Sequence, residues 1–379
     1  MAAFGAALSE HPTASFAVGE VVGSVIEQVG ESPDMALVFV AGHDSADFVD
    51  IADAIRTLLS PAVLVGATAV GVVGGDLEAE DGPAISLWAG RVGEVEAVRL
   101  ETVRAPEGTA VVGMPDAAAD GARTLVLLTD PFSFPVDALT KASNAQYPHL
   151  RIVGGVASRP GGPGANRLVL DGRVHDDGAV GVLLPAGLDE FTVVSQGCRP
   201  VGQPFIVTSS EDNLIQGLGM RPPLERLQDL VAEADDDERA LLASGLHMGV
   251  VVDETASEFG RGDFLVRGVL GADQASGGLR IGDRAPVGTT VQFHVRDAAT
   301  ASEDLDALLE TVDADAALVF TCNGRGQRLF DERHHDASRV AEAVRRGPVA
   351  GMFCAGEVGP VGGHNHVHGF TASVLFLFG

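Results

Sequence analysis

Apolar residues follow a helical spacing at the start of the chain and then fall into short continuous runs. A run at residues 35–40 predicts a buried strand, and shorter runs at 63–65 and 84–89 predict two more. Two helices are expected beside them, one over residues 16–29 and one after the polar residues Asp44 and Ser45, either of which can cap it. The apolar stripes of these helices are Val18, Val21, Val22, Val25, Ile26 and Val29, and Phe48, Ile51, Ala52, Ile55, Leu58 and Leu59.

The order strand, helix, strand, glycine-rich loop, strand occurs three times. The second copy has strands at 125–129, 151–153 and 179–184, with a helix starting at Pro135, a favourable first position. The third has strands at 316–320, 349–353 and 370–378, with a helix over 337–346. This internal repeat predicts an α/β fold of β-α-β-β units in mixed sheets with helices on one face. We expect the paired strands of each copy, which a loop joins, to be antiparallel.

A different segment separates the second and third copies. A helix follows Pro222 and Pro223, and strands are expected at 248–252, 264–270 and 290–295. The acidic run 235–238 is interpreted as a solvated face. We divide the chain into an N-terminal helix, 1–29, and two domains, 30–208 and 209–379.

The formal charge is −28, which opposes binding to nucleic acid and to anionic membranes. Three cysteines argue for a reducing compartment and against a disulfide scaffold. The chain begins with no signal-peptide pattern, and no apolar run is long enough to span a membrane. These features predict an acidic cytoplasmic protein. A single lysine, Lys141, among many arginines indicates a GC-rich bacterial source.

The loop 321–326 carries the most polar chemistry of the strand-end loops. Such loops gather at one sheet edge and present N–H groups to ligands. Arg325 has a planar donor set suited to a carboxylate, with Asn323 and Thr371 as hydrogen-bonding groups. Glu357 is expected either to hold a ligand amine or to pair with Arg325. The first alternative predicts a ligand site in which Arg325 faces a cavity, and the second a structural ion pair.

Two catalytic alternatives remain at this point. Cys354 could act as a nucleophile if His366 or His368 activated it and Asn365 oriented the base. His364, His366 and His368 alternate along a predicted strand and could hold zinc. The structural interpretation of the same residues is that Cys354 packs as an inert buried side chain and that the histidines form hydrogen bonds to the backbone. No phosphate-binding loop, dinucleotide fingerprint or nucleophile elbow is present, so we predict no cofactor. No acidic or cysteine ligand stands at a standard spacing from the three histidines, so we predict no metal.

Several stretches resemble FIST domains, named for F-box proteins and intracellular signal transduction. Residues 320–326, 353–363, 368–372, 265–271 and 291–298 resemble the C-terminal FIST domain, and 64–69, 74–75 and 196–202 the N-terminal one. The resemblance implies a sensory domain that binds a small ligand, for example an amino acid. The candidate ligand-binding residues are Thr68, Ser158, Cys198, Arg199, Cys322, Asn323, Arg325, Cys354, Glu357, Asn365, His368 and Thr371.

The function expected from this reasoning is a small-molecule sensory module without a catalytic output of its own. Related architectures join the domain to kinase, cyclase-like, chemoreceptor or F-box outputs, for which this chain has no room, so a separate signalling partner is expected. Two rivals stay open: a thiol- or metal-assisted hydrolase using Cys354 or the three histidines, and a protein-interaction scaffold.

Overall fold

The computed structural model describes residues 2–105, 108–121, 123–256, 259–260 and 262–379. The chain forms two compact units that are not consecutive halves of the sequence. One, the three-sheet unit, takes the chain up to Val194 and residues 305–367 and 371–379. The other, the barrel unit, takes residues 195–304 and 368–370. The long segment of the barrel unit therefore lies between the second and third repeats.

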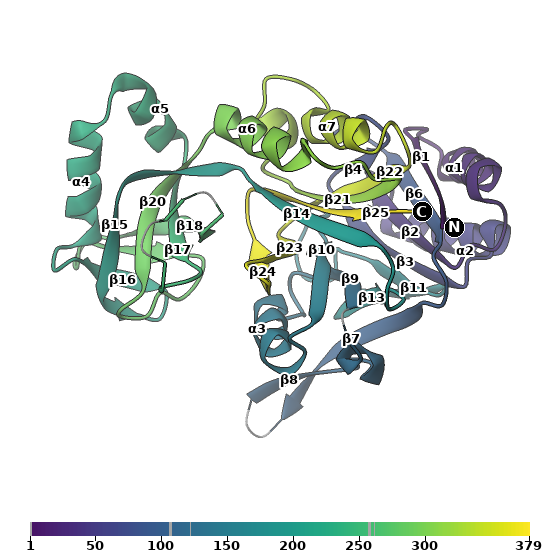
Figure 1. Ribbon diagram of the computed structural model, residues 1–379, viewed down its shortest axis with the longest axis horizontal. Coiled ribbons are helices and arrows are strands. Elements are labelled where there is room, and N and C mark those ends of the chain that lie inside the picture. The colour runs from purple at the N-terminus through teal and green to yellow at the C-terminus, as the bar shows by residue number, and fades with distance from the viewer. Residues whose placement is uncertain (1, 106–107, 122, 257–258, 261) are drawn as a thin grey trace. The chain divides into compact units, whose positions relative to one another are not determined.

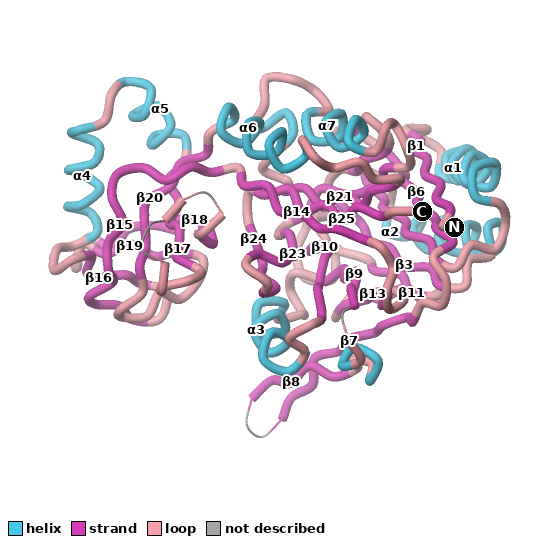
Figure 2. Tube along the Cα trace, viewed as in Figure 1, coloured by secondary structure: helices cyan, strands magenta, loops and turns pink. Residues whose placement is uncertain are grey.

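The three-sheet unit contains the three predicted copies, each with one central strand (Figures 1 and 2). In every copy the central strand is followed by a helix, a parallel strand and, later, an antiparallel strand. The copies are β2 (Met35–Ala41), α2 (Ser45–Leu59), β3 (Val63–Ala69) and β6 (Ala84–Arg91); β9 (Arg123–Thr129), α3 (Val136–Gln146), β10 (Leu150–Val156) and β13 (Ala179–Leu183); and β21 (Ala316–Cys322), α7 (His335–Ala343), β22 (Val349–Cys354) and β25 (Thr371–Leu377).

This confirms the repeat and the mixed sheets but corrects one pairing. The two strands that a loop joins in each copy, such as β3 and β6, are not neighbours, because the first strand lies between them. A helical crossover brings the second strand back parallel to the first. The third strand then occupies the free side of the first.

The glycine-rich loops between the second and third strands contain hairpins that the sequence did not predict. Each hairpin pairs with the second strand of a different copy. The hairpins are β4 (Val72–Gly74) with β5 (Leu77–Ala79), which extends the third copy's sheet at β22; β11 (Leu168–Leu170) with β12 (Arg173–His175), which extends the first at β3; and β23 (Glu357–Val361) with β24 (His364–His368), which extends the second at β10. The first copy thus adds its hairpin to the third, the second copy to the first, and the third copy to the second, so each sheet contains strands from two copies.

An additional strand precedes each copy and lies beside its third strand. These strands are β1 (Ala3–Ser9), β7 (Glu96–Ala105) with its hairpin partner β8 (Gly108–Val112), and β14 (Glu190–Gln196). A 3-10 turn, η1 (Asp116–Ala119), lies between β8 and β9, and a second, η2 (Gly326–Arg328), follows β21.

Each sheet buries both of its faces. One face enters a core shared by all three sheets, with Phe39 of β2 against Phe320 of β21 at a ring-centroid distance of 6.0 Å. The other face packs on helices, which confirms the prediction of helices on one face. These are α1 (Ala14–Val29) with α2 on the first sheet, α3 on the second, and α6 (Ala298–Leu309) with α7 on the third. The predicted stripes are buried except that Leu58 is exposed and Ile26 half-buried.

The barrel unit is a closed six-stranded barrel with a core of its own. Helix α4 begins after Pro222, as predicted, and α5 begins at the acidic run, where Asp235 caps it by accepting a hydrogen bond from the Glu238 N–H at 2.8 Å. Its elements are β15 (Cys198–Glu211), β16 (Leu214–Leu218), α4 (Pro223–Glu233), α5 (Asp236–Ser244), β17 (Leu246–Val251), β18 (Phe264–Asp273), β19 (Gly278–Ile281) and β20 (Thr290–Arg296). In the described part of the chain, no helix is long and apolar enough to cross a bilayer.

Candidate functional site

Arg325 lies in the loop after β21, fully buried and bound to Asp336 at the start of α7. Its Nε donates to one carboxylate oxygen of Asp336 at 2.8 Å and its Nη2 to the other at 2.7 Å. Among the described residues, Arg325 lines none of three open surface pockets. Neither the expected open cavity nor the expected pairing with Glu357 is present. A bidentate pair with a nearer acid satisfies most of the guanidinium.

Glu357, at the start of β23, is also fully buried. One carboxyl oxygen accepts hydrogen bonds from the Thr371 N–H at 3.1 Å and hydroxyl at 2.7 Å. Burial raises the pKa of Glu357 to about 8, although the Thr371 bonds and the nearby Arg325 charge act to lower it. Glu357 is therefore a neutral acid at pH 7 that ties β23 to β25.

Glu78, on β5 of the first copy's hairpin, holds the first turn of α7. Its Oε1 accepts from the N–H groups of Asp336 at 2.9 Å and Ala337 at 3.0 Å, and its own N–H donates to His334 Nδ1 at 2.9 Å. Burial and the Asp336 charge raise the pKa of Glu78 to about 8. The hairpin of the first copy thus caps the N-terminus of α7, a helix of the third copy.

Asp336 is the ionised acid of this group. Burial alone would raise its pKa, but the Arg325 charge and hydrogen bonds, with His335 Nδ1 at 2.8 Å, bring that pKa well below its ordinary value. His335 stacks on Phe330 with ring centroids 3.3 Å apart. We call Glu78, Arg325, Asp336 and Glu357 the acid–arginine cluster.

Three atoms of the acid–arginine cluster have no hydrogen-bond partner although they are buried. They are Arg325 Nη1, Glu357 Oε1 and Glu78 Oε2. Such atoms are costly in a dry interior unless an internal water or another small molecule satisfies them. The cluster is polar but closed.

The two cysteines beside the cluster are buried. Cys322 and Cys354 are register partners on β21 and β22. Burial, with the neighbouring Glu357, raises the pKa of the Cys354 thiol well above its ordinary value, and its Sγ lies 3.6 Å from the Met352 carbonyl oxygen. Asn323, partly exposed, donates its N–H to the Cys354 carbonyl at 2.8 Å. These contacts are those of packing and loop closure.

Three of the other candidates make backbone hydrogen bonds within the three-sheet unit. Thr68 Oγ1 accepts from the Arg167 N–H at 2.9 Å, and Ser158 Oγ accepts from the Val70 N–H at 3.0 Å. Asn365 joins β24 to β10, accepting from the Ile152 N–H and donating to the Leu150 carbonyl, both at 2.8 Å. Its amide is committed to the backbone rather than to a catalytic base.

The remaining candidates belong to the barrel unit. Cys198 is buried there, and Arg199 pairs with Asp297 at 2.8 Å and with Glu238 at 3.4 Å. His368 is buried in this unit, whereas His364, on the same strand β24, is exposed. Over the described residues, no three His, Cys, Asp or Glu side chains are grouped as metal ligands.

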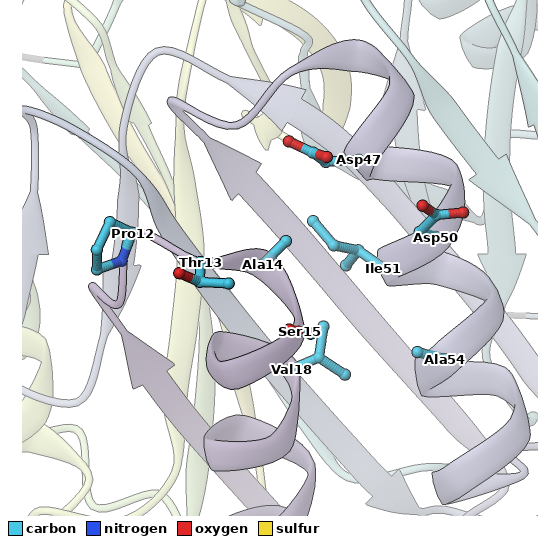
Figure 3. Close-up of a pocket in the computed structure, with 9 residues that line it drawn as sticks. All are labelled: Pro12, Thr13, Ala14, Ser15, Val18, Asp47, Asp50, Ile51 and Ala54. Atoms are coloured by element: carbon cyan, nitrogen blue, oxygen red, sulfur yellow. The ribbon is translucent and has the colours of Figure 1, made fainter.

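An open groove lies between the starts of α1 and α2 (Figure 3). Its volume is about 580 Å³, within the range of small-molecule sites. Val18 and Ile51 lie between the two helices, and Asp47 and Asp50 stand on α2 (Figure 3). Its other lining residues are Pro12, Thr13, Ala14, Ser15 and Ala54. The groove thus combines an apolar floor with a few polar groups.

The polar groups of the groove have opposite character on its two sides. Thr13 is the cap residue of α1, yet its side chain makes no capping hydrogen bond, and the first turn of α1 contains no acid. The first N–H groups of a helix have no acceptor within that helix, so this side favours an anion. Asp50 is exposed and Asp47 partly so, and their carboxylates favour a cation on the other side.

Sequence reasoning missed both Asp336 and the groove. Asp336 directly precedes the predicted helix 337–346, where an acid at a helix start was a usable signal. Nothing in the sequence pairs the starts of α1 and α2, because that proximity arises from their packing on one sheet.

Comparison with known proteins assigns the family. The model of the FIST N domain matches residues 34–221, and that of the FIST C domain matches residues 223–360. The chain is a FIST domain protein. Both matches agree with the resemblance read from the sequence motifs. The acid–arginine cluster lies within the matched FIST residues, whereas the α1 side of the groove precedes them.

Relatives extend the FIST similarity to almost the full chain. Uncharacterized protein Rv0628c of Mycobacterium tuberculosis is 41% identical over 381 residues, covering 98% of this chain and 99% of the relative. Uncharacterized protein Mb0898c of Mycobacterium bovis is 41% identical over 374 residues, covering 97% and 96%. These relatives assign no ligand or activity.

Proposed function

We propose that this FIST protein is a cytoplasmic sensory module that binds a small zwitterionic molecule, with amino acids the first class to test. The observation that carries the proposal is the α1–α2 groove, where an apolar floor separates unpaired helix N–H groups from two carboxylates. A free amino acid carries a carboxylate, an ammonium group and a side chain. These three parts correspond to the three kinds of surface in the groove.

The carboxylate of such a ligand would lie at the start of α1. Ala14 and Ser15 supply the first N–H groups there, and the free Thr13 hydroxyl can add a third donor. The ammonium group would lie at Asp47 and Asp50. Asp47 already accepts the Asp44 N–H at 3.2 Å, so Asp50 is the carboxylate with more freedom to bind a ligand.

We also propose that the protein passes its signal to a separate partner and does no chemistry itself. The thiol alternative needs a reactive, accessible cysteine, and all three cysteines are buried. The raised pKa of the Cys354 thiol keeps it protonated at pH 7. These features support a binding role over a hydrolase.

Isothermal titration of the purified protein against an amino-acid panel tests the proposal. We expect one or more binders, and about tenfold weaker binding in Asp50→Asn, because an ion pair partly shielded from water is lost. Asp53→Asn is the matched control, since Asp53 is exposed on the same helix but does not line the groove. A panel without binders, or equal affinity in Asp50→Asn and wild type, contradicts the proposal.

A further inference from the structure

The acid–arginine cluster holds more acid than its single guanidinium can neutralise. Arg325 is paired in bidentate fashion with Asp336, so that pair is already neutral. Glu78 and Glu357 are 3% and 0% exposed, and neither forms an ion pair with Arg325. An unpaired carboxylate in a dry interior costs several kcal/mol, so both must be protonated in the closed structure.

Both acids lie against the same loop, 322–336. Glu78 comes from the hairpin of the first copy and binds the first turn of α7. Glu357 begins the hairpin that pairs with the second copy, binds Thr371 of β25, and lies beside Arg325 and the Cys322 side chain of the loop. Between them lies loop 322–336, which contains Arg325 and η2. Opening this loop would expose both acids to water.

We propose that Glu78 and Glu357 form a proton-controlled lock on loop 322–336, which stays closed while both acids are protonated and opens with release of their protons. The charged neighbours of Glu78 oppose its ionisation, whereas the neighbours of Glu357 favour its ionisation and burial alone opposes it. Glu78 meets the negative charges of Asp336 and Glu80, with His334 and His335 beside it. Glu357 meets Arg325, which favours its ionisation, and the thiols of Cys322 and Cys354.

The pH window of the lock follows from linkage. The pKa of each acid is about 8 in the closed state, against an ordinary value of 4.5 once it is exposed to water. Opening therefore becomes more favourable as pH rises between these two values and is nearly constant above about pH 8. The window includes physiological pH.

Hydrogen exchange measured by mass spectrometry tests the lock on the full chain. After correction for intrinsic exchange, we expect opening of peptides covering 322–337 to increase at least tenfold from about pH 5 to about pH 8. Peptides of α2 should show no matching change. In the Glu78→Gln, Glu357→Gln double variant, whose amides mimic protonated acids, the increase should vanish. An unchanged increase in that variant, or none in wild type, overturns the lock.

Glu80→Gln is the matched control. Glu80 is partly exposed and accepts the Gln327 N–H at 2.9 Å, so it touches the same loop without being a buried acid. Loss of the Glu80 carboxylate should increase hydrogen exchange of loop 322–336 at every pH, and the increase in exchange from about pH 5 to about pH 8 should remain as in wild type. If the Gln double variant fails to fold, infrared spectroscopy of wild type decides instead: a protonated carboxyl band at pH 7 supports the lock, and its absence overturns it.

Discussion

The acid–arginine cluster and the α1–α2 groove contain similar side chains and differ in nearly every physical property. The cluster is buried, and its one arginine is paired with Asp336 within the chain. The groove is open, and its carboxylates and helix N–H groups face outward. A polar residue in a strand-end loop is therefore no guide to ligand binding by itself. What distinguishes the two regions is whether the chain already satisfies the polar groups.

The largest expected effect comes from removing Arg325. In Arg325→Met, the fully buried Asp336 loses its bidentate arginine partner. We expect the free energy of unfolding to fall by about 3–5 kcal/mol, measured by urea denaturation. A loss below about 1 kcal/mol would mean that the cluster is not the buried, structural region described above.

The next effect is a fall in stability as pH rises. The pKa values of Glu78 and Glu357 are raised to about 8 in the folded state, so their contribution is complete below about pH 4.5 and is lost as pH rises toward 8. The pKa of Asp336 is lowered, so its contribution is lost as pH falls below its ordinary value near 3.8. From these three groups, denaturant unfolding should show maximum stability at about pH 4, with a continuous loss above about pH 4.5. A maximum above pH 7 would contradict the assignment.

A proline substitution at the start of α1 tests the groove's anion-binding side. Ala14 is the first residue of α1, where proline is tolerated, and Thr13 before it has the extended conformation that proline requires, with φ −96° and ψ 116°. Ala14→Pro should change stability by less than about 0.5 kcal/mol but weaken binding of a carboxylate ligand severalfold, since one N–H donor is removed. Calorimetry and thermal unfolding of the same sample measure both. Unchanged affinity would place the carboxylate elsewhere.

The smallest effect concerns Asp50. Because Asp50 is exposed and its carboxylate forms no hydrogen bond or ion pair with a described residue, Asp50→Asn should leave the free energy of unfolding within about 0.5 kcal/mol of wild type. A larger loss, seen in urea denaturation, would show that Asp50 supports the fold and would remove it as a clean probe of ligand binding.

The parts of the fold that were predictable are those with strong local patterns. β2 is a run of seven buried residues, and the stripe of α2 has Phe48, Ile51 and Ile55 at helical spacing. The hairpins were not predictable, because strands of three residues such as β4 and β5 carry little pattern and pair with a different copy. The partner of Arg325 was missed for a related reason: an arginine has many acids available in so acidic a chain, and only packing selects one.

The most direct measurement is a hydrogen-exchange footprint of an amino acid identified by calorimetry, comparing the bound and free protein. The account predicts protection at residues 13–18 and 44–54, which border the groove, and no change at 322–328. Protection confined to 322–328 would contradict it and return Arg325 to the role of ligand anchor.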